Sequence, residues 1–182
     1  MEKSNESAKV LQTKHLLASK LMELLEKKTL KKISVKDICQ NALISKSAFY
    51  LHFEDKYQLL QYCLEEETER WEIAAKGKTA QEAILYILEA ILEKKKFYYN
   101  IFNDIQNHEE IDIILSVFVR IFTTKLQEKE KKVDTLLGPI SIVGAFYAGG
   151  IVSANIQWIR NDFNIPKEEI AECQQKLLAN IF

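Results

Sequence analysis

The segment SKSAFYLHF, residues 45–53, combines small side chains with side chains that end in polar groups. These are the groups in this sequence best suited to contact a charged polymer. Lys46 offers an ammonium, and Tyr50 and His52 add polar tips at the ends of rings. A lysine can donate to a phosphate oxygen or to guanine O6 and N7, and the methyl of Ala48 can pack on a thymine methyl. This segment is therefore suited to contact the backbone and the base edges of a nucleic acid.

Two short helices must position this segment. Within ISVKDICQNALISKSAFYLHF, residues 33–53, Ser34 can cap a first helix, and Asp37 stands where the acid of a capping box belongs. Residues 42–44 carry the chain round a corner, and Ser45 can cap the second helix. Two short helices meeting at a steep angle form a helix-turn-helix, whose second helix fits the major groove of DNA.

These residues resemble the DNA-binding domain of TetR-type bacterial transcriptional regulators, the TetR/AcrR family. The resemblance spans about Thr13 to Leu60 and is carried by Asp37-Ile38, Ala42, Ser45, Lys46, Phe49-Tyr50, His52-Phe53 and Lys56. Leu43 departs from it, because the family usually has a turn glycine there, and a leucine in a left-handed turn is strained. Ser47 also departs, since a second small residue, often glycine, is common at that position.

The positions expected at the DNA lie outside the core face of the second helix and at the starts of its two neighbours. They are Lys36, Ser45, Lys46, Ser47, Ala48, Tyr50, Leu51, His52 and Lys56. Phe49 and Phe53 are expected in the core. In the alternative, a small bundle without nucleic acid, Tyr50 and His52 are ordinary surface residues.

Composition and charge agree with this hypothesis. The chain has 182 residues, is 47% hydrophobic, and contains 5 Gly and 2 Pro, which favours long helices around a sizeable core. Residues 1–60 hold 11 Lys and no Arg against 7 acidic residues, whereas residues 61–182 hold 14 basic and 19 acidic residues. A basic N-terminal third suits a protein that meets phosphate at one end.

The N-terminus is polar and lacks a signal-peptide region. We find no apolar run of the roughly 18 residues that a membrane span needs. A cytoplasmic protein without a membrane segment is therefore expected.

Apolar residues recur with helical period along the rest of the chain, and no stretch alternates as a strand would. We expect an all-α protein of about nine helices, at about 7–27, two within 33–53, then 54–75, 79–96, 97–107, 109–131, 139–160 and one opening at Pro166. Residues 1–7 are expected to be disordered. The predicted organisation is a helix-turn-helix domain at 1–56 and an effector-binding and dimerisation domain at 57–182, with the helix at 54–75 shared by both.

The helix at 139–160, PISIVGAFYAGGIVSANIQWIR, is rich in small residues. Interior glycine costs about 1 kcal/mol in a helix, and small side chains let another helix approach closely. The family resemblance implies that the last two helices pack against their copies in a homodimer, so that two recognition helices read a palindromic operator. The residues expected at that interface are Gly144, Ala148, Gly149, Ile151, Trp158 and Leu177. Close packing within one chain is the alternative.

Aromatic residues gather in the middle helices. The family resemblance implies an effector pocket there, and an aromatic lining with few polar groups suits a small apolar effector. The expected lining residues are Trp71, Tyr86, Tyr98, Phe102, Phe118 and Phe122. A filled aromatic core is the alternative.

We find no nucleophile–base spacing, no metal-ligand cluster and no glycine-rich phosphate loop. The three cysteines, Cys39, Cys63 and Cys173, share no metal-type spacing and are expected as small buried side chains, with a redox sensor as the alternative. No catalytic residue, metal or cofactor is therefore predicted, and the enzyme hypothesis is set aside.

Two hypotheses remain. The first is a homodimeric repressor that binds double-stranded DNA at a palindromic operator and is released by a small-molecule effector. The alternative keeps the fold but places the regulator, a co-activator, under the control of a partner protein. The segment GAFYAGGI, residues 144–151, followed by Trp158, resembles a C-terminal type found in some Firmicute-like regulators, including relatives that work with protein partners.

Overall fold

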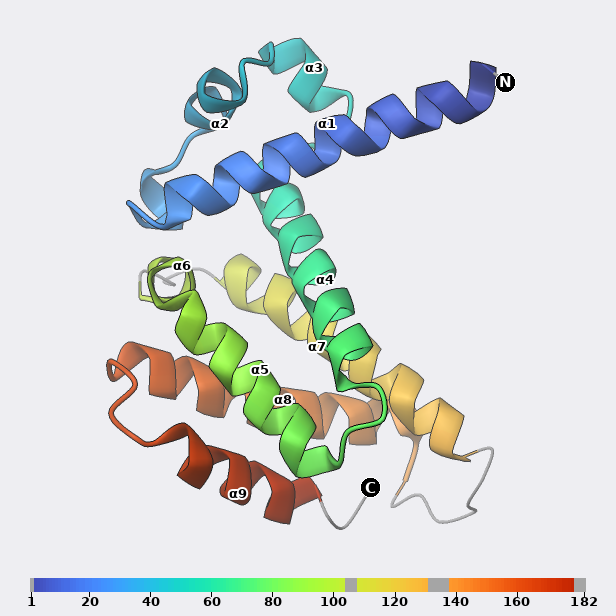
Figure 1. The fold of residues 1–182 in the computed structure, drawn as a ribbon, viewed down its shortest axis with the longest axis vertical. Coiled ribbons are helices and arrows are strands. Elements are labelled where there is room, and N and C mark those ends of the chain that lie inside the picture. Colours follow the sequence, from blue (N-terminus) through green and yellow to red (C-terminus); the bar gives the residue numbers. More distant parts are fainter. Residues whose placement is uncertain (1, 104–107, 131–137, 179–182) are drawn as a thin grey trace. The chain divides into compact units, whose positions relative to one another are not determined.

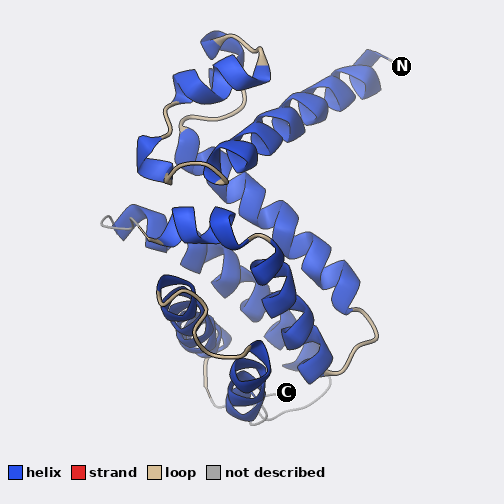
Figure 2. Ribbon diagram, turned by 60° about the vertical axis from the view of Figure 1, so that its left-hand side comes forward, coloured by secondary structure: helices blue, strands red, loops and turns tan. Residues whose placement is uncertain are grey.

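The computed structural model describes residues 2–103, 108–130 and 138–178, and within these residues the secondary structure is helical, without a strand (Figure 1, Figure 2). The elements are α1 (Glu2–Leu25), the 3-10 helix η1 (Leu30–Lys32), α2 (Val35–Ala42), α3 (Lys46–Tyr50), α4 (Lys56–Ala75), α5 (Ala80–Glu93), α6 (Lys95–Phe102), α7 (His108–Glu130), α8 (Ile140–Arg160) and α9 (Lys167–Leu178). The predicted all-α class is confirmed.

The chain forms two compact units. The N-terminal unit comprises Met1–Glu66 and Lys96–Asp104, and the C-terminal unit comprises Glu67–Lys95 and Ile105–Phe182. The chain therefore passes from one unit to the other inside α4 and again at the start of α6. The compact units divide after Glu66, further along α4 than the domain boundary predicted after residue 56. That boundary stays a prediction.

The core of the N-terminal unit begins on one face of α1, where Leu17, Leu21 and Leu25 repeat every four residues and are fully buried. Burial of each such side chain contributes about 1.5–3 kcal/mol relative to exposure. α6 belongs to the same unit, and the Asn100 side chain donates a hydrogen bond of 2.7 Å to the Leu25 carbonyl. That bond satisfies one of the carbonyls that the end of α1 leaves without a helical partner.

In the C-terminal unit, α7 packs along α8 and α5 packs along α9 (Figure 1). Gly144 lets α7 and α8 approach, because a Cβ atom at this position would lie 2.6 Å from the Thr123 Oγ1. The small residue at this point on α8 is therefore required by packing inside the chain.

A buried carboxylate joins α4 to the end of α5 within the C-terminal unit. The Glu67 side chain is almost entirely buried and accepts hydrogen bonds from Lys94 Nζ at 2.6 Å and from Arg70 Nη1 at 2.8 Å. Loss of Lys94 would leave this charge buried without its interhelical partner, which is costly in a low-dielectric interior.

Several predictions about the elements need correction. α1 begins at Glu2, not near residue 7, because the polar N-terminal sequence contains good helix formers such as Glu and Lys. α3 ends at Tyr50, where Leu51 serves as its C-cap. Cys39 and Cys63 are buried as predicted, but Cys173 is exposed.

α8 also corrects the prediction that no segment is long and apolar enough to span a membrane. Among the described helices it passes that test, because it has 21 residues and contains an apolar window of 18 residues with a mean hydropathy of 1.3. Length and composition alone decide this test, and a core helix of a globular protein passes it too. Only 28% of the apolar window is buried inside the chain, so much of this helix faces outward.

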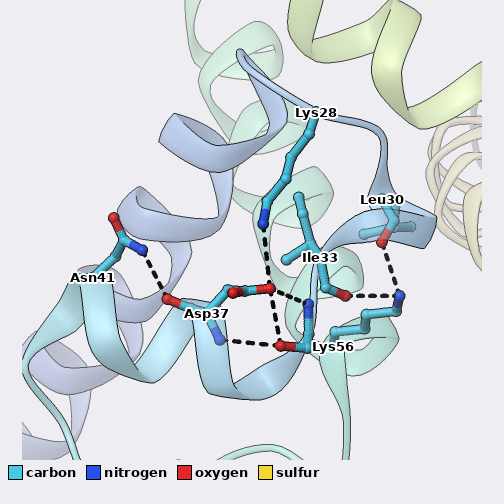
Figure 3. Close-up of polar contacts among 7 residues, drawn as sticks. Lys28, Leu30, Ile33, Asp37, Asn41 and Lys56 are labelled. Atoms are coloured by element: carbon cyan, nitrogen blue, oxygen red, sulfur yellow. Dashed lines mark hydrogen bonds and ion pairs between the residues drawn. The ribbon is translucent and has the colours of Figure 1, made fainter.

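The predicted capping box at the start of α2 is confirmed (Figure 3). Ser34 Oγ accepts the Asp37 N–H at 3.2 Å, and Asp37 Oδ2 accepts the Ser34 N–H at 2.9 Å. The hydrogen bonds from the backbone and hydroxyl of Ser34, followed by the neighbouring Lys28 ammonium, lower the pKa of Asp37 to about 2. The ionised carboxylate thus stabilises the start of the helix-turn-helix.

This pKa predicts a dependence of stability on pH. Because the folded pKa lies below the unfolded value of about 3.9, the contribution of Asp37 is complete above that value and is lost as the pH falls towards about 2. Asp37→Asn should therefore lower the free energy of unfolding at about pH 5 and lose that difference progressively on acidification. Denaturant unfolding at several pH values measures it.

Asp112→Asn is the matched control, because Asp112 is exposed on α7 outside this box. A difference between Asp37→Asn and the parent protein that stays constant from about pH 5 to pH 3 would contradict the assignment.

Candidate functional site

The corner between α2 and α3 sets the direction of the second helix. Leu43 closes α2 in the left-handed conformation, with φ 55° and ψ 37°, and its side chain is 94% exposed. A side chain with a Cβ pays about 1–2 kcal/mol there, so the strain expected for a leucine in this turn is present. Beyond the corner, Ser45 Oγ accepts the Ala48 N–H at 3.1 Å and caps α3.

Buried aromatic rings fix α3 against the core of the N-terminal unit. Phe49 and Phe53 are buried, as predicted, and their ring centroids lie 5.9 Å apart. With these rings facing inward, the opposite face of α3 meets solvent. Of the residues predicted at DNA, Lys36, Ser45, Lys46, Ser47, Tyr50 and Leu51 are exposed, and Ala48, His52 and Lys56 are half-buried.

The Lys56 side chain forms hydrogen bonds to backbone carbonyls within the N-terminal unit. Its Nζ donates to the Leu30 carbonyl at 2.8 Å and to the Ile33 carbonyl at 3.0 Å, which ties the start of α4 to the η1 turn (Figure 3). The DNA contact predicted for this lysine stays a prediction, and its hydrogen bonds show that Lys56 fixes the segment leading into the helix-turn-helix.

Cys39 lies beneath the same corner. Burial raises the pKa of its thiol. The reactive form of a cysteine is the thiolate, so a raised pKa weakens the redox-sensor alternative for this residue.

A cavity of about 220 Å³ lies inside the C-terminal unit. Its walls are mostly apolar and come from α4, α5, α7, α8 and α9. The lining residues are Thr68, Trp71, Glu72, Ala75, Ala80, Ala83, Ile84, Ile87, Ile91, Phe118, Ile151, Asn155, Gln174 and Leu178. The rings of Trp71 and Phe118 lie 6.4 Å apart with a 40° tilt and form the aromatic part of the wall.

The structure places only some of the predicted pocket aromatics at this cavity. Trp71 and Phe118 line it. Tyr86 does not line it and is 39% exposed on α5. Tyr98 and Phe102 lie elsewhere, because α6 belongs to the N-terminal unit, where the two rings stack with centroids 6.3 Å apart. The side chain of Phe122 is outside the described part of the structure.

Sequence reasoning missed the polar residues of the cavity. Gln174 is 6% exposed, and its Nε2 donates to Asn155 Oδ1 at 2.7 Å. A signal was present, because Gln174 interrupts an apolar face of α9 at the position between Ile170 and Leu178, each four residues away. A polar side chain inside an apolar stripe is expected to have a partner or a function.

The residues of α8 and α9 predicted at the dimer interface differ in their burial, and the interface itself stays a prediction. Gly144, Ala148 and Trp158 are buried inside the chain, and Trp158 Nε1 donates to the Ile165 carbonyl at 2.8 Å. Ile151 lines the cavity. Of the predicted interface residues, Gly149, where an added Cβ atom would meet nothing within 4 Å, and Leu177, which is 62% exposed, have open surroundings.

Within the described residues, no group of three His, Cys, Asp or Glu side chains is placed to hold a metal ion.

Two family models match this chain. Residues 19–63 match the bacterial regulatory proteins of the tetR family, and residues 78–180 match a transcriptional regulator C-terminal region. The second match covers more than half of the chain. With a helix-turn-helix at one end and a helical unit containing a cavity at the other, the chain belongs to the TetR family of transcriptional regulators.

Solved structures share the fold. A TetR transcriptional regulator from Streptococcus agalactiae is similar with a TM-score of 0.63 and 17% identity, over 97% of this chain and 98% of that one. The dihydroxyacetone kinase operon activator DhaS is similar with a TM-score of 0.59 and 23% identity, over 93% and 96%.

FadR from Bacillus subtilis, in complex with stearoyl-CoA, has a TM-score of 0.60 and 17% identity, over 90% of this chain and 96% of that one. No curated protein is a significant match to this sequence.

Lys46, which is exposed at the start of α3, allows a test of whether this helix contacts DNA. Lys46→Ala should weaken DNA binding without altering the fold, because the side chain is exposed. A lysine that reads guanine would cost about 1–3 kcal/mol at one base position, whereas a phosphate contact would weaken binding evenly and reduce the salt slope by about one. Fluorescence anisotropy at several salt concentrations distinguishes the two.

Lys76→Ala removes the same charge from a site in the C-terminal unit and serves as the control. Equal affinities for DNA in the Lys46→Ala variant and the control would show that Lys46 lies away from the DNA.

Proposed function

We propose that this protein is a cytoplasmic, non-enzymatic repressor that binds a palindromic operator as a homodimer and leaves it when a small-molecule effector enters the C-terminal cavity. The observation that carries the proposal is that α4 lines the cavity at one end and leads out of the helix-turn-helix at the other.

The DNA-binding half of the proposal rests on the face of α3. A capped helix held by two buried phenylalanines presents Lys46, Ser47 and Tyr50 to solvent. Side chains of these types contact phosphates and base edges when a recognition helix lies in the major groove. The basic N-terminal third adds attraction to DNA that does not depend on sequence.

The effector half rests on α4. Thr68, Trp71 and Ala75 of this helix line the cavity, while its first residue, Lys56, is bonded to the segment before α2. An effector that binds one orientation of α4 more tightly than another would shift the population towards that orientation. The structure of FadR with stearoyl-CoA supports the idea that this fold can hold a small molecule.

The homodimer rests on the outer face of α8. Ile142 and Phe146 are 65% and 74% exposed, and Gly149 and Ser153 continue the same face at helical spacing. An apolar patch of this kind marks an interaction surface, and the small residues after it allow close helix approach. Leu177 on α9 adds a further exposed apolar side chain.

Binding assays with DNA that flanks the protein's own coding region test the function. The protein should retard a fragment containing an inverted repeat and leave a scrambled fragment unshifted. A molecule that binds the cavity should then reduce operator affinity, by about 5- to 150-fold for typical coupling. Because coupling is reciprocal, operator DNA must weaken binding of that molecule by the same factor.

A second candidate is an activator controlled by a partner protein. The fold is shared with a protein named as an operon activator, and the exposed face of α8 could receive a different chain. Operator affinity that no cavity ligand changes, together with transcription that rises when the regulator is present, would favour this candidate over the repressor.

The exposed apolar face of α8 allows a direct test of the proposed homodimer. Phe146→Glu should dissociate the homodimer, because it places a charge in the proposed apolar contact while the fold, which does not bury this ring, stays intact. Sedimentation velocity measures the oligomeric state, and circular dichroism confirms the helical content.

Ile73→Glu is the matched control, since Ile73 is 68% exposed on α4 and lies outside the proposed face. A Phe146→Glu variant that sediments as the parent protein does would place the dimer contact elsewhere.

A further inference from the structure

We propose that the cavity selects a largely apolar ligand without negative charge, whose single polar group, a hydroxyl or carboxamide, both donates and accepts a hydrogen bond at Gln174 and Asn155. This inference rests on the proposed function, in which the cavity is the effector site, and it adds the chemical class of the effector.

The apolar part of the ligand follows from the walls. Three isoleucines of α5, Ile84, Ile87 and Ile91, form one side, and the rings of Trp71 and Phe118 contribute another. Surfaces of this kind gain free energy by removing apolar ligand surface from water and offer few groups that would satisfy a second polar substituent. A ligand with several hydroxyl groups would therefore lose hydrogen bonds on entry.

The polar group follows from the pair formed by Gln174 and Asn155. Their mutual hydrogen bond occupies one carbonyl oxygen and one amide N–H. Each amide has one carbonyl and two N–H groups, so the pair keeps a carbonyl oxygen and further N–H donors for a ligand. This remains true if both amides are rotated, because the roles of the two residues simply exchange. A hydroxyl or a carboxamide can accept from one member of the pair and donate to the other.

The absence of negative charge on the ligand follows from the charges at the cavity. None of the described lining residues is Lys, Arg or His, and the one ionisable side chain among them is the exposed Glu72. A carboxylate or phosphate entering this site would lose its hydration without gaining an opposite charge, and Glu72 would repel it. Anionic molecules should therefore bind more weakly than neutral ones even when their apolar parts fit.

The size of the cavity limits the ligand further. A volume of about 220 Å³ lies below the range of about 300–1,000 Å³ that is usual for drug-sized ligands. A medium-chain or monocyclic molecule suits it better than a long acyl chain or a fused ring system.

Three probes of equal chain length separate the classes: 1-octanol, octanamide and octanoate. Isothermal titration of the full-length protein at about pH 7.5, where octanoate is ionised, should show binding of the alcohol and the amide, with octanoate about tenfold or more weaker. Octanoate that binds as tightly as octanamide, or failure of both neutral probes to bind, would overturn the proposal.

Paired variants on α9 locate the polar contact. Gln174→Leu should weaken octanamide binding about tenfold while retaining the apolar contacts, because the amide of the ligand then loses one of its two hydrogen-bond partners. Gln175→Leu makes the same chemical change at the next residue, which does not line the cavity, and should bind octanamide as the parent does. Equal loss in both variants, or no loss in Gln174→Leu, would place the polar contact elsewhere, and circular dichroism of each variant confirms its fold.

Operator binding in the presence of each probe keeps this inference separate from the proposed function. Octanamide that binds at Gln174 and leaves operator affinity unchanged supports the ligand class but counts against effector release. Release of operator by octanoate and not by octanamide supports effector release and overturns the ligand class.

Discussion

The buried carboxylate of Glu67 is the constraint on which the C-terminal unit depends. Its bond to Lys94 joins α4 to the end of α5, and these two helices form parts of the cavity wall through Trp71 and the isoleucines of α5. At the opposite end, the two helices are joined by a short loop in which Gly77 has φ 78°. The cavity wall is thus fixed by an ion pair at one end and a tight turn at the other. Loss of Lys94 would be costly, because the Glu67 carboxylate would stay buried without its interhelical partner, whereas the Lys94 side chain is itself partly exposed.

Most of the fold could be predicted from the sequence because its signals are local. The Ser34 and Thr79 capping boxes are both present, and the apolar face of α1 is buried as its spacing indicates. Helix ends without such a signal are harder to predict, as the early end of α3 and the extension of α1 to Glu2 show. At those ends, tertiary contacts and general helix propensity decide the boundary, and neither leaves a distinct local pattern.

The helix-turn-helix was predictable from the sequence, and the lining of the cavity in the C-terminal unit was much less so. Periodicity indicates that Tyr98 and Phe102 are buried, but not that α6 returns to the N-terminal unit and packs them there. Small residues carry a similar ambiguity. A Cβ atom at Gly144 would meet Thr123 inside the chain, whereas one at Gly149, further along α8, would meet nothing within 4 Å, so the same residue type stands in two different environments. Only the identity of the neighbouring helix separates these cases.

The N-terminal unit is built from two separate pieces of chain, and this has a consequence for engineering. A fragment that ended at Glu66 would lack α6, and the Leu25 carbonyl at the end of α1 would lose the Asn100 side chain that bonds to it. A chimaeric regulator made by joining only the contiguous N-terminal head to a foreign body would separate two parts of one compact unit. A functional chimaera of this protein therefore needs residues 96–104, or a matching segment, transplanted together with the head.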